Sequence, residues 1–127
     1  MGCMRALPIL LMFLVGPPAW ALSDVDQRAL CKAISSGNIV RLWYRSGEGP
    51  RILQPRYLGW NKAGRLVLNG WQISGFSDSP TLPANRTFRL DRTWRLEISD
   101  KPMQGPVASG RLPASIVTMI CSVPLPN

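Results

Sequence analysis

The pattern that most constrains this chain is an alternation of side chains with a period of two, which starts at Asn38. In the stretch NIVRLWYRS, every second residue is apolar: Val40, Leu42 and Tyr44. The intervening positions carry arginine and an aromatic ring: Arg41, Trp43 and Arg45. Because successive side chains of a β-strand point to opposite faces, the pattern predicts a strand with one apolar face and one cationic, aromatic face.

Two further strand-like segments follow, each bounded by turn residues. They are RILQPRYLGW, residues 51–60, and GRLVLNGWQI, residues 64–73. Pro55 has no N–H group to donate to a neighbouring strand, so it predicts an edge position or a bulge. The polar stretch SGFSDSPTLPAN predicts a long loop, either over a binding face or as a simple connection. The chain has only 127 residues, with twelve prolines and eleven glycines. We therefore expect one mainly β domain with short elements.

Arginine occupies every third position of the stretch NRTFRLDRTWRLEIS: Arg86, Arg89, Arg92 and Arg95. On a helix this spacing would form one basic stripe, whereas a strand divides the four guanidinium groups between its two faces. Apolar residues alternate with polar ones in two runs, which favours a strand pair or one bent strand. The runs are Phe88 and Leu90, then Trp94, Leu96 and Ile98. Arg86 and Arg92 share the apolar phase, where a buried unpaired guanidinium is costly. We expect a bend at Asp91 and Arg92 that turns Arg92 outward.

The N-terminus has the three parts of a secretory signal peptide. MGCMR is a short basic region, ALPILLMFLV is an apolar core, and GPPAWA ends in an A-x-A cleavage pattern. The apolar run is too short to span a bilayer, which takes about twenty residues. We therefore expect residues 1–21 to be a signal peptide cleaved after Ala21, and the protein to be exported to the periplasm or secreted, with no transmembrane anchor.

Export determines how the cysteines are interpreted. The mature chain keeps two, Cys31 and Cys121, and an oxidising compartment favours a disulfide between them, although two buried free thiols are the alternative. Ser23 can cap a helix that Gly37 ends. The apolar residues of this helix fall within one half of its surface: Val25, Ala29, Leu30, Ala33 and Ile34. Cys31 lies at the edge of that half, where a returning C-terminal segment could reach it.

The order of these segments resembles the WYL domain of bacterial regulators. The likeness runs from about Ala29 to Asp100, through LCKAISSGN, VRLWYRSGEGPRILQPRYLGW, GRLVLNGW and RTFRLDRTWRLEI. The residues that match the family pattern are Tyr44, Arg51, Pro55, Phe88, Arg89, Asp91 and Arg92. The tripeptide that names the family appears here as Leu66-Val67-Leu68, and the chain has a signal peptide where the family usually has a DNA-binding helix-turn-helix domain. A transcription factor is therefore not expected.

The resemblance implies a small Sm-like or SH3-type barrel of about five strands, preceded by one helix, in residues 22–100. It also implies a ligand-sensing role, with nucleotide-like effectors or nucleic acid bound by basic and aromatic residues. Arg89 and Arg92 are the residues we expect at the ligand. The full set of candidate binding residues is Arg51, Arg89, Arg92, Tyr44, Arg41, Trp43 and Arg45.

Charge agrees with an anionic ligand or an acidic protein partner. Fifteen lysines and arginines stand against seven acidic residues, and twelve of the fifteen are arginine, whose planar fork matches phosphate and carboxylate. Codon usage is the alternative cause of such a composition. Three functions stay open: binding of an anionic ligand, a structural or interaction module of the cell envelope, and binding of single-stranded nucleic acid. If the protein binds an anionic ligand, a basic groove with an aromatic ring for stacking would be formed by Arg41, Trp43 and Arg45.

Catalysis and metal binding find little support. The chain has no histidine for general-base chemistry, its seven acids form no convincing pair, and two cysteines cannot complete a zinc site. We therefore expect no enzyme activity, no cofactor and no metal. Residues 101–127 form a proline-rich extension that should pack on the barrel. Its stretch SIVTMICSV is compatible with a strand or with a short helix.

Overall fold

The computed structural model describes residues 24–102 and 112–123, so the expected signal peptide lies outside the described residues. The elements are the helix α2 (Asp24–Ser36), the 3-10 helix η2 (Leu90–Arg92), and the strands β1 (Asn38–Tyr44), β2 (Arg51–Trp60), β3 (Leu66–Gly75), β4 (Ala84–Arg89), β5 (Thr93–Pro102) and β6 (Thr118–Ser122). The prediction of a mainly β chain with a helix before the first strand is therefore confirmed. Within the described part of the chain, no helix is long and apolar enough to cross a membrane.

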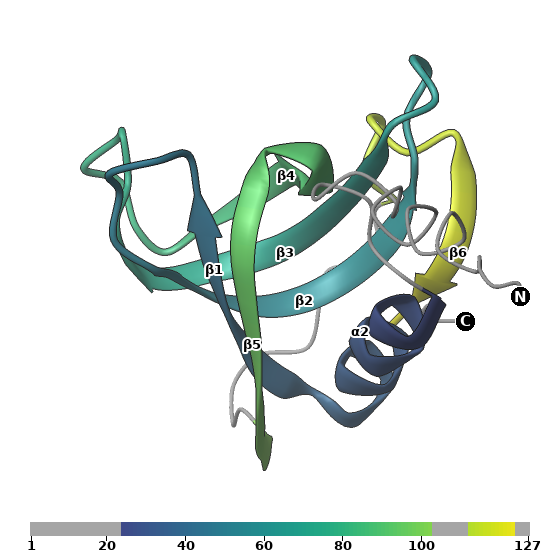
Figure 1. The fold of residues 1–127 in the computed structure, drawn as a ribbon, viewed down its shortest axis with the longest axis horizontal. Helices are drawn as coiled ribbons and strands as arrows, with labels where there is room; N and C mark the ends of the chain where they lie inside the picture. The colour runs from purple at the N-terminus through teal and green to yellow at the C-terminus, as the bar shows by residue number, and fades with distance from the viewer. Residues whose placement is uncertain (1–23, 103–111, 124–127) are drawn as a thin grey trace, which may run out of the picture.

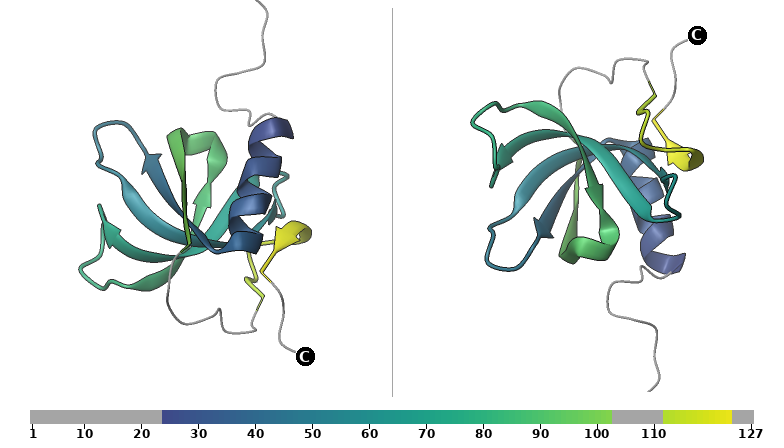
Figure 2. Two further views of the ribbon diagram at one scale, coloured as in Figure 1. Left: turned by 90° about the horizontal axis from the view of Figure 1, so that it is seen from below. Right: turned by 90° about the horizontal axis from the view of Figure 1, so that it is seen from above.

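All six strands belong to one antiparallel sheet. Its order is β4-β3-β2-β1-β5, and β6 pairs with β2 outside this path (Figure 1). The sheet is strongly curved, with α2 and β6 at the end opposite the loops that follow β1 and β3 (Figure 2). Pairing among the described strands leaves β4 and β5 as edges, so the sheet is open and the barrel stays a prediction. The sixth strand exceeds the expected number because part of the C-terminal extension joins the sheet.

The alternation predicted for β1 is present in the structure. Val40 and Leu42 are fully buried and Tyr44 is nearly so, whereas Arg41 is exposed. These residues belong to a core that also contains Leu30 and Ile34 of α2. The predicted helix face is wrong at Ala29, which is exposed.

Strand β2 has the predicted bounds but a different place in the sheet. It lies between β1 and β3, so an edge position for Pro55 is excluded. The other expectation for this residue is confirmed, because the register with β3 shifts between Pro55 and Tyr57, as a bulge requires. The bulge lets a proline lie inside a central strand.

The bend predicted at Asp91 and Arg92 is also confirmed. The 3-10 helix η2 separates β4 from β5 and leaves Arg92 exposed. This bend changes which residues of β5 face the core, so the prediction that the apolar residues of β5 share one buried face is wrong in part. Trp94 is 56% exposed and Ile98 is 37% exposed, although both belong to the apolar run of the sequence pattern.

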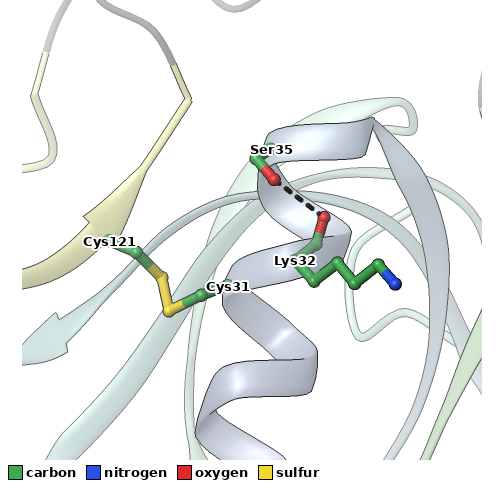
Figure 3. Close-up of a disulfide and its surroundings, with 4 residues drawn as sticks. All are labelled: Cys31, Lys32, Ser35 and Cys121. Carbon is green, nitrogen blue, oxygen red and sulfur yellow. Dashed lines mark hydrogen bonds between the residues drawn. A yellow bond between two sulfur atoms is a disulfide. The ribbon is translucent and has the colours of Figure 1, made fainter.

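A disulfide joins Cys31 of α2 to Cys121 of β6, as predicted (Figure 3). The two residues are 90 positions apart, and their Cα atoms are 5.7 Å apart. Figure 3 shows that Lys32 points away from this bond and that the Ser35 hydroxyl donates to the Lys32 carbonyl oxygen. The disulfide therefore fixes the C-terminal strand against the N-terminal helix.

At the opposite end, the loop after β3 packs against the turn before β2. The Phe76 N–H donates to the Pro50 carbonyl oxygen over 3.0 Å. Gly75 has a φ of +91°, and a Cβ atom there would lie 2.3 Å from the same oxygen. Glycine is therefore required for this close approach. The contact holds residues 76–83 beside the end of β1, where the candidate site lies.

Candidate anion-binding site

Two adjoining hollows lie where the turn after β1, the loop after β3 and the end of β4 meet. The first has a volume of about 280 Å³, and its charged lining residues are Arg45, Arg51, Arg86 and Asp78. The second has a volume of about 560 Å³ and is lined by Arg45, Asp91, Arg92 and Trp94 among others. Because Arg45 lines both hollows, they form one surface, which we call the arginine cleft.

Arg51 forms the floor of the arginine cleft. It is only 3% exposed, and its guanidinium carbon lies 5.2–5.6 Å from the ring centres of Tyr44, Phe76 and Phe88. Its Nη2 donates to Glu48 over 3.0 Å, whereas its Nε is buried without a hydrogen-bond partner. The aromatic rings stabilise the buried cation and fix its position.

Arg45 connects the two hollows through its backbone. Its φ is +33°, a region that non-glycine residues rarely occupy and that stores strain. The Arg45 N–H donates to the Arg92 carbonyl oxygen over 3.3 Å, and the Trp94 indole N–H donates to the Arg45 carbonyl oxygen over 3.0 Å. These bonds hold the strained residue, whose Nη1 lies 3.7 Å from the Asp78 carboxylate in the first hollow.

Arg86 is a site residue that the sequence analysis did not select. It lies on the same face of β4 as the buried Phe88, and its Nη2 donates to the Thr81 carbonyl oxygen over 3.4 Å. Its Nε is buried without a hydrogen-bond partner, and it forms no ion pair with a described carboxylate. The position of Arg86 in the apolar phase was the signal that could have identified it.

Asp78 is the only acidic residue that lines the first hollow. Its carboxylate lies 3.7 Å from Arg45 and 3.6 Å from Arg51, and its side chain is 59% exposed. Neither contact is short enough for a good hydrogen bond. Arg45 and Arg51 therefore share this loosely held carboxylate, besides their pairing with Glu48, in a hollow that Arg86 also lines. An external anion could take the place of Asp78.

Arg92 and Arg89 differ in their pairing, although both were expected at the ligand. Arg92 is exposed in the second hollow and has no ion pair with a described carboxylate. Arg89 donates from Nε and Nη2 to the two oxygens of Asp91, over 2.9 and 2.6 Å. This bidentate bond raises the pKa of Arg89 and lowers the pKa of Asp91, and Arg65 also donates to Asp91. Arg89 therefore lies outside the arginine cleft with its charge compensated.

The structure separates Arg41 and Trp43 from the other candidates. Arg41 pairs with Glu97 on β5 over 3.0 Å and lines a different, more apolar hollow. The Trp43 ring lies 4.6 Å from the Arg95 guanidinium and 6.2 Å from the Trp94 ring. Of the seven predicted binding residues, four line the arginine cleft: Tyr44, Arg45, Arg51 and Arg92.

The described residues contain no group of three or more side chains that could hold a metal ion. Comparison with protein families, with curated proteins and with solved structures gives no match for this chain. The arginine cleft is therefore interpreted from its own chemistry.

Proposed function

We propose that this protein is an exported, non-enzymatic binding domain that recognises an anionic ligand in the arginine cleft. The ligand class is nucleotide-like, nucleic acid or another polyanion. The observation that carries the proposal is that Arg45, Arg51 and Arg86 line one hollow, in which Asp78 lies 3.7 Å from Arg45 and 3.6 Å from Arg51. Arginine is the side chain best suited to bind phosphate and carboxylate through paired hydrogen bonds.

The roles within the cleft follow from burial and pairing. Arg51 is held by aromatic rings and provides a fixed positive charge at the floor. Arg86 and Arg92 have no ion pair with a described carboxylate, so their positive charges are available to an anion, although one Arg86 donor bonds to the Thr81 carbonyl oxygen. Trp94 is 56% exposed beside Arg92 and offers a flat surface on which a base or sugar ring can stack.

The proposed architecture is a small Sm-like or SH3-type barrel similar to the WYL domain. The strand order β4-β3-β2-β1-β5, the curvature of the sheet and the short η2 between β4 and β5 support this proposal. The Cys31–Cys121 disulfide supports export, since such bonds persist in oxidising compartments.

Fluorescence anisotropy tests the proposed function with two labelled probes, a single-stranded oligonucleotide and heparin. Arg86→Gln and Arg92→Gln should each weaken binding of the preferred probe about tenfold, which corresponds to about 1.4 kcal/mol. Arg41→Gln is the matched control, because it removes the same charge from another hollow and should change affinity less than twofold. Equal losses in all three variants would show only non-specific attraction and would reject the arginine cleft as the site.

A second candidate function is an interaction module of the cell envelope. Apolar side chains are exposed where β6 runs beside the end of β2: Trp60, Val117, Met119 and Ile120. If this surface is the functional one, Met119→Glu should abolish association with the partner, whereas Arg86→Gln should leave it unchanged. Co-purification from the native envelope with both variants distinguishes this function from anion binding.

A further inference from the structure

A second arginine site lies in the middle of β2, away from the arginine cleft. Arg56 follows Pro55 at the bulge and is only 6% exposed. Its guanidinium carbon lies 5.2 Å from the centre of the Trp71 ring on β3. Trp71 is half-buried and pairs across the strands with Gln54. The arginine is therefore enclosed by the sheet and stacked on one aromatic ring.

No ion pair of Arg56 is found among the acidic side chains that the structure describes. The structure describes the side chains of six of the seven acids, and none of the ion pairs among the described residues includes Arg56. Four of these acids are paired with other arginines: Glu48, Asp78, Asp91 and Glu97. The Arg56 Nε is also buried without a hydrogen-bond partner. A buried, unpaired guanidinium is expensive, and burial lowers the pKa of Arg56.

Three other buried polar atoms of β2 and β3 also lack partners. The Tyr57 hydroxyl, the Gln54 Oε1 and the Asn69 Oδ1 are buried without hydrogen bonds. Tyr57 follows Arg56 in β2 and pairs directly with Asn69 across the strands. Buried polar groups are normally satisfied, so the unsatisfied Arg56 Nε–H indicates a missing acceptor.

We propose that Arg56, Trp71 and Tyr57 form a binding site for a carboxylate group of a ligand. The guanidinium would donate two parallel hydrogen bonds to the carboxylate, and the Tyr57 hydroxyl can donate a further one. A singly charged carboxylate fits better than a phosphate dianion, because the site provides one positive charge and otherwise neutral groups. The site shares no residue with the arginine cleft and does not depend on the function proposed there.

Nuclear magnetic resonance on the full, oxidised chain tests this site directly. Acetate, benzoate and a short peptide with a free C-terminal carboxylate are titrated at constant ionic strength, with chloride and the C-terminally amidated peptide as controls. We expect saturable shifts of the Arg56 Nε–H and Trp71 indole signals with carboxylates and none with the controls. Tighter binding of the peptide would identify a protein segment as the source of the carboxylate, and tighter binding of benzoate a small molecule. Unchanged signals with all three carboxylates would overturn the proposal.

Thermal unfolding of Arg56→Met provides an independent readout. Removing an unpaired buried charge should leave the ligand-free protein at least as stable as the wild type, because methionine keeps much of the packing. The rise in melting temperature that carboxylate gives the wild type should disappear in the variant. A large fall in the melting temperature of ligand-free Arg56→Met would instead show that the stacked arginine only stabilises the fold. If this variant does not fold, the wild-type titration still decides.

Discussion

At the scale of single residues, pairing decides which arginines are available to a ligand. The sequence identified Tyr44, Arg45, Arg51 and Arg92, which line the arginine cleft. It also selected Arg41, which lies outside the cleft. The register of β1 and β5 places Glu97 directly opposite Arg41, and nothing in the local sequence pattern reveals this pairing. The pairing of an arginine with an acid on a distant strand depends on register, and one sequence does not specify register well enough to predict it.

The bidentate pair of Arg89 and Asp91 predicts a specific pH dependence. The pKa of Asp91 is lowered in the folded protein, so its contribution to stability is present above the unfolded aspartate value of about 4 and is lost as the pH falls through the lower folded value. As the pH falls from about 5 to about 2, the free energy of unfolding of Asp91→Asn should therefore decrease less than that of the wild type.

Chemical denaturation at several pH values measures this difference. At neutral pH, Asp91→Asn should be less stable by about 1 kcal/mol or less, because the pair is partly exposed to solvent. Asp100→Asn is the control, since Asp100 is exposed and forms no ion pair with a described residue. An identical acid response in both variants would contradict the assigned role of Asp91.

At the scale of elements, the positions of the strands in the sequence were easier to predict than their pairing and the direction in which their side chains point. The bounds of β2 and the bend at η2 follow from turn residues and from the cost of burying Arg92. The exposure of Trp94 was not predicted, because the bend changes which residues of β5 face the core. The pairing of β6 with β2 was not predictable either, since its β-branched residues suit a strand or a short helix equally.

The close contact at Gly75 gives a prediction for the loop that carries Asp78. Gly75→Ala combines a positive φ with a Cβ atom 2.3 Å from the Pro50 carbonyl oxygen, so this contact must open. Gly64→Ala is the matched control, with a φ of +75° and no atom within 4 Å of the added Cβ. Denaturation should show Gly75→Ala to be less stable than the control by at least about 1 kcal/mol. Equal losses would mean that the close approach contributes nothing.

At the scale of the whole molecule, the disulfide and the arginine cleft lie at opposite ends of the sheet. The disulfide joins α2 to β6 at one end. The arginine cleft is lined by residues from the turn after β1, the loop after β3 and β4, and the loops after β1 and β3 lie at the other end of the sheet (Figure 1). Replacing both Cys31 and Cys121 with alanine should lower the free energy of unfolding by up to about 4 kcal/mol, because the bond closes a loop of 90 residues. Under conditions where the variant is folded, its affinity for the anionic probe should match that of the wild type. Weaker binding by the folded variant would show that the two ends are coupled.

The affinity of Asp78→Asn for the single-stranded oligonucleotide tests the central claim most directly. If Asp78 occupies the place of the ligand between Arg45 and Arg51, neutralising it should tighten binding about fivefold to tenfold, or roughly 1 kcal/mol. Asp100→Asn adds the same net charge on β5 and should change affinity less than twofold. Binding by Asp78→Asn that is unchanged, weaker or equal to that of Asp100→Asn would contradict anion recognition in the arginine cleft.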